Sequence, residues 1–391
     1  MLTRRIVPQE RRWKSLNPSL LRAAPALAGV FAIALGGLGR AEPAQAETAD
    51  SPLHFHGYID VHYNNPELET MDQGAVSEAD VHRAALGWSY EFTPNIRLDA
   101  EVDYEHGADE IEVEYAHIED DLTSSLTLRA GSVLLPVGPL NEAHEPTLYY
   151  SVERPYVETT IVPTTWQEIG LGLIGRTGSG GLAYRGYLVT GLDATRIGSI
   201  RGMDDVQTHG SHNKAEDLAG VARVEYAWTS GLSFGASGYY GGADQSEPGL
   251  GQVNVGIANA DARYRAHGLD LRGVYYRVMV DGADSVSAFV GETIGKAMMG
   301  WYGEAAYDVL GKDLAAGRRS LVVFGRYEAF DTNLETPAGF AAEPGAFRSV
   351  ITGGIAYYPI EKVAFKADFE HWKDDTDAEL NRLNLGAAVR F

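Results

Sequence analysis

The chain ends in the stretch Leu383-Asn384-Leu385-Gly386-Ala387-Ala388-Val389-Arg390-Phe391. Successive side chains of a β-strand point to opposite faces, so the odd-numbered residues of this stretch, all apolar, share one face. Asn384 and Arg390 lie on the other face. Edge strands of soluble proteins seldom leave an apolar face uncovered. The stretch therefore predicts a strand with an apolar environment on one side and a polar environment on the other.

Alternating segments of this kind recur along most of the chain. Tight turns and longer links join them in alternation, and this arrangement is typical of a transmembrane β-barrel. We predict an all-β fold, a 16-stranded antiparallel transmembrane β-barrel without helices. The last strand, which ends at Phe391, resembles the assembly signal of bacterial outer-membrane β-barrels. The predicted strands cover residues 53–64, 80–92, 96–106, 111–120, 126–136, 167–177, 181–192, 218–228, 232–242, 252–265, 269–281, 295–309, 318–330, 348–358, 362–373 and 380–391.

The first 46 residues have a different character from the rest of the chain. A basic stretch precedes an uncharged apolar run over residues 23–39, and Ala44-Gln45-Ala46 offers a small-x-small cleavage site. The alternative is a membrane anchor, but the run is short for a transmembrane helix and contains glycines and a proline. We predict that residues 1–46 are a cleaved signal peptide and that residues 47–391 form the barrel domain.

Composition excludes several classes of protein. The chain carries 54 acidic and 32 basic residues, whereas a general nucleic-acid binder needs a basic surface. It contains no cysteine, which excludes disulfides, thiol catalysis and thiolate metal sites. We expect no cofactor and no nucleic-acid partner.

Charged residues occupy one face of several predicted strands, as a water-filled lumen requires. The charges of the predicted lumen wall are segregated by sign, which allows two interpretations. In the first, opposed walls create a transverse field across the pore, and in the second the charges pair locally. The acidic wall comprises Asp99, Glu101, Asp103, Glu105, Glu112 and Glu114, expected near the outer mouth, and the basic wall comprises Arg129, Arg176, Arg185, Arg223, Arg263, Arg326 and Lys366.

The longest link, residues 137–166, contains the densest group of motifs. It includes Leu135-Pro136-Val137-Gly138-Pro139-Leu140-Asn141-Glu142-Ala143-His144-Glu145-Pro146, Tyr150-Ser151-Val152-Glu153-Arg154-Pro155 and Pro163-Thr164-Thr165-Trp166. Together with Gly57-Tyr58-Ile59-Asp60-Val61-His62-Tyr63-Asn64, these motifs resemble the phosphate-selective-porin-like family of outer-membrane porins. The resemblance implies that this third extracellular loop folds into the barrel as a constriction. The matching constriction residues are Glu142, His144, Glu145, Glu153 and Arg154.

Two further motifs have a simple structural interpretation. His54, His56, Asp60 and His62 share a strand face, but same-face neighbours lie roughly 6–7 Å apart, so one ion could not bind all four. We predict no metal site. Gly170-Leu171-Gly172-Leu173-Ile174-Gly175 matches G-x-G-x-x-G but precedes a strand instead of a helix, so it fails the context of a dinucleotide site. We expect its glycines to leave room for the 137–166 link.

These observations favour a passive channel for small hydrophilic solutes or ions in the bacterial outer membrane. Phosphate selectivity needs many basic donors, and the 137–166 link has one, Arg154, so we expect a modest cation preference. An anion- or phosphate-selective porin is the alternative. An outer-membrane barrel enzyme has only the adjacent Ser211 and His212 in its favour, and a barrel with a blocked lumen is a further rival. Expected partners are outer-membrane lipid, lipopolysaccharide and the barrel-assembly machinery, and the resemblance implies a homotrimer.

Overall fold

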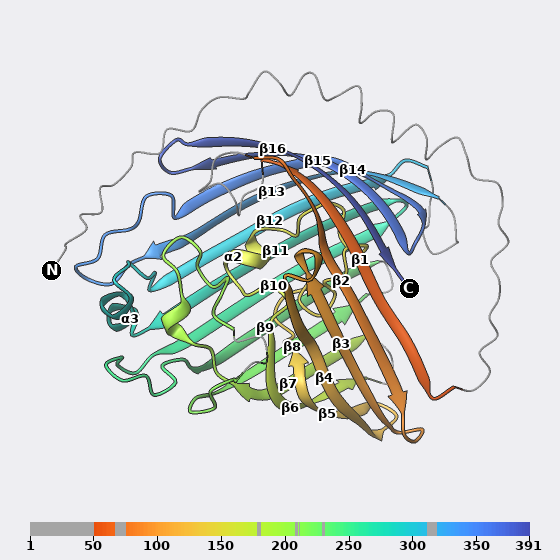
Figure 1. Ribbon diagram of the computed structural model, residues 1–391, viewed down its shortest axis with the longest axis horizontal. Helices are drawn as coiled ribbons and strands as arrows, with labels where there is room; N and C mark the ends of the chain where they lie inside the picture. The colour runs from red at the N-terminus through yellow and green to blue at the C-terminus, as the bar shows by residue number, and fades with distance from the viewer. Residues whose placement is uncertain are drawn as a thin grey trace.

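The computed structural model describes residues 51–66, 76–177, 181–207, 210, 212–228, 231–310 and 319–391. Within these residues, sixteen antiparallel strands form one closed barrel in which each strand pairs with its neighbours in the sequence (Figure 1). The predicted fold class is confirmed. The strands are β1 (Leu53–Asn65), β2 (Glu78–Glu91), β3 (Ile96–Glu105), β4 (Glu110–Thr123), β5 (Leu126–Leu134), β6 (Gln167–Arg176), β7 (Leu182–Thr190), β8 (Leu218–Ala227), β9 (Leu232–Gly242), β10 (Asn254–Ala266), β11 (Leu269–Asp281), β12 (Ala297–Asp308), β13 (Ser320–Glu335), β14 (Phe347–Ile360), β15 (Val363–Asp374) and β16 (Glu379–Arg390).

The last strand closes the barrel. β16 pairs with β15 and also with β1, from Tyr58 opposite Arg390 to Asn65 opposite Leu383. The amide of Phe391 donates a hydrogen bond to the carbonyl of Gly57 (3.0 Å) and extends this pairing by one residue. The predicted signal peptide lies outside the described residues.

Links of different length define the two ends of the barrel. The end with the tight turns, such as 93–95 and 267–268, is called the short-turn end here, and the opposite end is called the long-loop end. Four short helices lie in links of the described chain: η2 (His106–Ala108), α2 (Val157–Thr160), η3 (Ala194–Arg196) and α3 (Ala283–Val290). The expectation of a chain without helices was therefore wrong, most clearly for α3. No helix among the described residues is long and apolar enough to cross a membrane.

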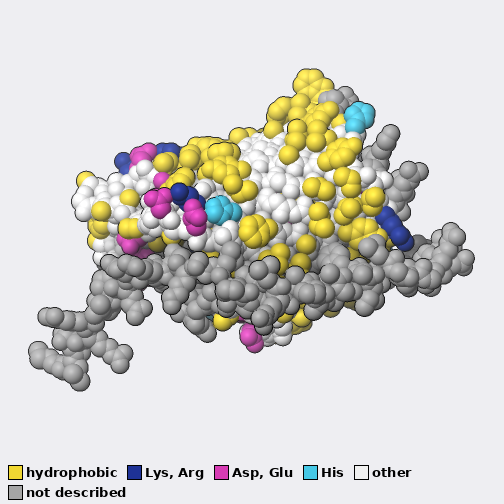
Figure 2. All heavy atoms as spheres, turned by 90° about the horizontal axis from the view of Figure 1, so that it is seen from above, with side chains coloured by type: hydrophobic (Ala, Val, Ile, Leu, Met, Phe, Trp, Pro, Cys, Tyr) yellow, Lys and Arg dark blue, Asp and Glu magenta, His cyan; other side chains and the backbone are white. Residues whose placement is uncertain are grey.

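The two faces of the strands differ as the alternation predicts. Tyr276 is fully buried, whereas its neighbour Tyr275 is 41% exposed on the outside of β11. Tyr302 and Trp301 of β12 repeat this contrast. Large apolar side chains are exposed on the outer face of nearly every strand, and Figure 2 shows one such face, with charged side chains gathered toward its ends. An apolar outer surface and a polar interior suit a barrel surrounded by lipid.

The interior is not polar throughout. Inward residues of β8 to β13, including Tyr239, Tyr276 and Phe330, form an apolar cluster with residues of the 137–166 segment such as Val157 and Trp166. The water-filled lumen was predicted from the strands that carry charges on one face, and the apolar inner faces of the other strands were not considered. The apolar half of the wall holds the segment, and the charged half leaves space beside it.

A bulge changes the inward face of β4. The register between β3 and β4 shifts after Glu101, so Glu114 and Tyr115 both lie on the inner side. Beyond the bulge His117 and Glu119 are buried, whereas Ile118 is 52% exposed on the outside. Regular alternation from Glu112 would have placed Ile118 inside, because one extra residue inverts the alternation of a strand.

The glycine-rich motif of β6 has a different function from the one expected. A Cβ atom at Gly172 would lie 2.2 Å from the carbonyl oxygen of Gly186 and 2.4 Å from the ring of Tyr187. A Cβ atom at Gly175 would meet the ring of Tyr184 at 2.2 Å. These two glycines therefore make room for aromatic side chains of β7, and not for the 137–166 segment.

Candidate functional site

The 137–166 segment leaves and re-enters the wall at one point between β5 and β6. The Leu135 amide donates to the Trp166 carbonyl (2.9 Å). The Asn141 amide group donates to the carbonyls of Leu135 and Trp166 (2.8 Å each), and its oxygen accepts from the Trp166 amide (2.6 Å). One buried side chain thus holds the two ends of the segment together.

One side of the segment packs against the apolar half of the wall. Ile161 and Trp166 are fully buried in the apolar cluster. The Tyr302 hydroxyl of β12 donates to Glu158 of α2 (2.7 Å). Burial raises the pKa of Glu158 to about 7, although the hydrogen bond from Tyr302 opposes this shift. Glu158 therefore places a carboxyl group with a pKa near neutrality between α2 and β12.

Polar groups of β13 and β15 hold the opposite side. Lys366 is buried, and its ammonium donates to the carbonyls of Pro146 (2.5 Å) and Ser151 (2.8 Å). The same ammonium lies 4.0 Å from the centre of the Tyr149 ring, within the range of a cation–π contact. Arg326 donates to the Ser151 hydroxyl (2.7 Å).

Further anchors reach strands on other sides of the barrel. The Val152 amide donates to Asp368 of β15 (2.6 Å), and the Tyr150 hydroxyl donates to Asp270 of β11 (2.7 Å). The Tyr156 hydroxyl accepts from Arg382 of β16 (2.5 Å). The segment is therefore fixed across the interior and not only at its base, as its position in Figure 1 shows.

The five segment residues singled out from the sequence lie where the segment meets the wall, and four of them (Glu142, His144, Glu145 and Glu153) contact separate strands. Glu142 accepts from Arg185 of β7 (2.7 Å). His144 lies 2.9 Å from Glu114 of β4, and Glu145 pairs with Arg390 of β16 (3.0 Å). Burial raises the pKa of Glu142, although Arg185 opposes the shift.

Glu153 and Arg154 face the interior from adjacent positions. Glu153 accepts from the Asn64 amide group (2.7 Å) and lies 3.4 Å from His62. Burial alone would raise the pKa of Glu153, but the nearby His62 and Arg382 hold the pKa well below its usual value. Arg154 instead donates within the segment, to the Thr165 hydroxyl (2.7 Å).

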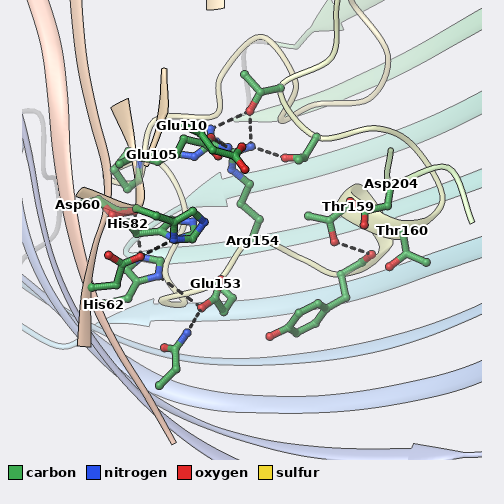
Figure 3. Close-up of a pocket in the computed structure, with 18 of the residues that line it drawn as sticks. Asp60, His62, His82, Glu105, Glu110, Glu153, Arg154, Thr159, Thr160 and Asp204 are labelled. Atoms are coloured by element: carbon green, nitrogen blue, oxygen red, sulfur yellow. Dashed lines mark hydrogen bonds and ion pairs between the residues drawn. The ribbon is translucent and has the colours of Figure 1, made fainter. Parts of the chain in front are cut away.

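Two cavities lie on opposite sides of the segment and share no lining residue. The long-loop cavity measures about 450 Å³ and is lined by strand ends near the long loops and by residues such as His82, Glu153 and Arg154 (Figure 3). The short-turn cavity measures about 440 Å³ and is lined by strand ends near the short turns, including Arg263 and Arg390. Residues 146–150 separate the two. Pro146 and Tyr149 line the long-loop cavity, and Thr147, Leu148 and Tyr150 line the other.

The two cavities differ in charge. Among the described residues, nine acidic and four arginine side chains line the long-loop cavity, together with three histidines. Five arginines and three acidic side chains line the short-turn cavity. The acidic residues of the long-loop cavity are Asp60, Glu78, Asp80, Glu105, Glu110, Glu112, Glu153, Asp204 and Asp205, and the arginines of the short-turn cavity are Arg223, Arg263, Arg265, Arg272 and Arg390.

The acidic wall runs along the barrel and is not gathered at one mouth. Glu105 and Glu112 line the long-loop cavity, whereas Asp99 lies closer to the short-turn end of β3. Asp103 and Glu114 are fully buried, and each lies 3.7 Å from Arg83 of β2. Glu101 lies 3.6 Å from His56.

The basic wall is also paired locally. Arg129 donates to Glu119 (2.7 Å), and Arg223 donates to Asp261 (2.8 Å). Arg326 contacts Glu328 (2.8 Å), and Arg263 contacts Asp270 (2.5 Å). Arg185 pairs with Glu142 of the segment, and Arg176 is exposed beside the turn at residues 122–125. These contacts favour local pairing over a transverse field. The charges are instead separated between the two cavities, because the long-loop cavity is mainly acidic and the short-turn cavity is mainly basic.

Several residues of the site were missed at the sequence level. Arg83 and Arg382 are buried inward cations, and strand alternation could have identified them. The link after β7 also covers the segment, because the Gln207 side chain donates to the Thr164 carbonyl (2.7 Å) and accepts from the Gln167 amide (3.0 Å). No local pattern indicates this contact.

Comparison with known proteins places this geometry in context. No family model matches the sequence. The fold is shared with the outer membrane channel DcaP of Acinetobacter baumannii (TM-score 0.58, 10% identity, 87% of this chain and 97% of that one). It is also shared with an anion-selective porin from Comamonas acidovorans (TM-score 0.54, 11% identity, 87% and 99%). A third such structure is the trimer form of OmpT, an outer membrane protein of Vibrio cholerae (TM-score 0.54, 11% identity, 87% and 99%).

These three structures show a porin-like fold, and not the phosphate-selective family in particular. The sequence itself is 31% identical over 351 residues to an uncharacterized protein of Aquifex aeolicus, covering 84% of this chain and 78% of that protein. The chain belongs to the same family as this Aquifex aeolicus protein.

Proposed function

We propose that the protein is an outer-membrane porin, a passive diffusion channel for small hydrophilic solutes or ions. The observation that carries the proposal is the pair of polar cavities on either side of residues 146–150, inside a closed barrel with an apolar outer face. In this proposal the 137–166 segment forms the constriction, and solutes cross between the cavities along the charged half of the wall. A blocked barrel would have no need of charged cavities at both ends of the lumen.

The proposed channel has a modest cation preference. Nine carboxylates against four arginines in the long-loop cavity raise the local concentration of cations before the constriction, an effect that salt screens over about 10 Å at 0.1 M. An anion-selective channel is the second candidate. The five arginines of the short-turn cavity favour it, although Arg223, Arg263, Arg265 and Arg390 are each paired with a carboxylate.

The cellular setting follows from the same proposal. Residues 1–46 direct export, the terminal strand with Phe391 is read by the barrel-assembly machinery, and lipid and lipopolysaccharide surround the outer face. A homotrimer in the outer membrane is part of the proposal, supported by the trimer form known for one protein of the same fold. The proposal assigns no enzymatic activity, cofactor or metal requirement to transport.

The constriction is tested by recording single channels in planar bilayers. Replacing residues 145–152 by a short Gly-Ser link removes the partition between the cavities and keeps the apolar anchor at residues 157–166. We expect stable ohmic steps from the wild type and a severalfold larger conductance from the shortened variant. Shortening the exposed link at residues 338–343 is the matched control and should leave conductance unchanged. Wild-type silence, or equal conductance in all three proteins, contradicts the proposal.

Selectivity is tested separately with a salt gradient. Neutralising Glu78 and Glu110 together, both lining the long-loop cavity, should move the reversal potential toward anions. Arg223→Gln should move it toward cations. A wild-type channel that prefers chloride to potassium at low salt would replace the first candidate with the second.

A further inference from the structure

Three histidines meet in the long-loop cavity, although they come from separate parts of the chain. The His82 ring of β2 stacks on the His62 ring of β1, with 4.3 Å between their centres. The His106 ring of η2 meets His82 edge-on at 5.4 Å. Figure 3 shows the His62 and His82 rings side by side, next to Asp60 and close to Glu153. All three histidines line the cavity.

His82 lies at the centre of the cluster, and its ring nitrogens are candidates for binding a metal ion. No described residue forms a hydrogen bond with its ring nitrogens, although its ring is only partly exposed. His106 lies beside it, with its Nδ1 atom 2.5 Å from a carboxylate oxygen of Asp80. One ligand atom from each of Asp80, His82 and His106 can be chosen so that all lie within 4.8 Å of one another. Ligand atoms bound to one Zn²⁺ lie roughly 3.3–3.5 Å apart, so small movements of the three side chains would bring these atoms onto one ion.

A second set of ligands, His62, His82 and Glu153, has a comparable spacing. There, however, both ring nitrogens of His62 already face carboxylates, with Nε2 at 3.0 Å from Asp60 and Nδ1 at 3.4 Å from Glu153. An imidazole held between two carboxylates is stabilised as a cation and is a poor metal ligand. In the set with His106, the Asp80 carboxylate that lies beside the imidazole is itself one of the three ligands.

The backbone around His106 adopts conformations that need a reason. His106 has a φ of 47°, and Ala108 has a φ of 79°, both in the left-handed region that non-glycine residues rarely adopt. Gly107 between them has a φ of 66°. Strain of this kind often persists where a side chain must be held in a particular position. The His106 ring in this turn lies against His82 and Asp80.

We propose that Asp80, His82 and His106 form a binding site for a divalent transition-metal cation such as Zn²⁺ in the long-loop cavity. Two imidazoles and one carboxylate favour zinc, copper or nickel over magnesium and calcium, which prefer oxygen ligands only. Three protein ligands leave a coordination position for water, so the ion can be reached from the cavity. A metal ion at this position would replace the contact between His106 Nδ1 and the Asp80 carboxylate. The site does not depend on whether the barrel conducts.

The proposal is tested by titrating Zn²⁺ into the folded, tag-free barrel in detergent and following the heat of binding. We expect one zinc ion per chain, no comparable binding of Mg²⁺, and affinity at least tenfold weaker in both His82→Asn and His106→Asn. His267→Asn is the matched control, because His267 is exposed in the turn at the short-turn end. Equal zinc affinity in the wild type and in His82→Asn would overturn the site.

His62→Asn separates the two sets of ligands. The proposed site predicts that this variant keeps zinc affinity within a few-fold of the wild type. Loss of binding in His62→Asn with retention in His106→Asn would reject the assigned ligands. Each variant is also tested for single-channel conductance without zinc, so that a failure of the channel proposal is distinguished from a failure of the metal site.

Discussion

Lys366→Met tests whether the wall holds the 137–166 segment in place. The substitution keeps most of the apolar stem of this buried side chain but removes its ammonium. Two hydrogen bonds, to Pro146 (2.5 Å) and Ser151 (2.8 Å), and the contact with the Tyr149 ring are lost together. Two segment carbonyls then face an apolar methionine.

The expected loss follows from these contacts. Hydrogen bonds that involve a charged group contribute roughly 1.5–3 kcal/mol each, and the relief of lysine desolvation offsets part of the sum. A net loss of about 2–3 kcal/mol in the free energy of docking changes the ratio of docked to undocked segment by about 30- to 150-fold. The Val152 amide, which donates to Asp368, reports on this ratio because it exchanges with solvent when the segment undocks.

Hydrogen–deuterium exchange of the folded barrel, read on peptides that cover residues 140–156, provides the measurement. Exchange at Val152 should accelerate by the factor above in Lys366→Met and stay unchanged in Lys362→Met, where the lysine is exposed in the turn before β15. Exchange within twofold of the wild type in Lys366→Met would refute the view that this contact fixes the segment.

Three further predictions concern other parts of the barrel. Phe391→Ala should lower the yield of heat-modifiable barrel severalfold, whereas Ile360→Ala, which removes another exposed apolar side chain, should not; equal yields would contradict the terminal signal. In the docked segment the pKa of Glu158 is about 7, whereas the pKa of an exposed glutamate is roughly 4.3. The protonated carboxyl group therefore stabilises the docked segment fully below about pH 4.3, and this stabilisation is lost as the pH rises through 7. Hydrogen–deuterium exchange near α2, corrected for intrinsic rates, should therefore increase between about pH 4.3 and pH 7 in the wild type and stay constant in Glu158→Gln. If Glu158→Gln keeps the pH dependence, another group causes it. Asn141→Asp removes two donated hydrogen bonds and should lower the free energy of unfolding by about 2–4 kcal/mol, measured by calorimetry. The control Asn95→Asp, at an exposed position, should leave the free energy of unfolding unchanged.

Local patterns were sufficient for the barrel, because every strand has its own alternation. All sixteen predicted strands are confirmed, and the largest difference in bounds is at β13, which continues to Glu335 instead of residue 330. The bulge beside Glu114 was not predictable, since one extra residue leaves no mark in composition. Helix α3 was missed because it occupies a link that was interpreted only as a loop.

The site was less accessible to sequence reasoning, because its contacts join residues far apart in the chain. The 137–166 segment could be identified from its length and motifs, but its partners Lys366 and Arg382 lie more than two hundred residues later. His82 and His106 carry no metal motif, since their spacing has meaning only once β2 and η2 are neighbours. Charge alternation gave the faces of the strands, but not which charges pair.

The distant anchors of the segment have a consequence for the order of assembly. Lys366, Asp368 and Arg382 are among the last residues to be synthesised, yet they hold a segment that precedes them by more than two hundred residues. Contacts of such long sequence separation form late, because the intervening chain must first be ordered. The contacts with Lys366, Asp368 and Arg382 therefore form only after β15 and β16 have joined the sheet, and a barrel halted before closure holds residues 146–156 less firmly than the apolar anchor at residues 157–166.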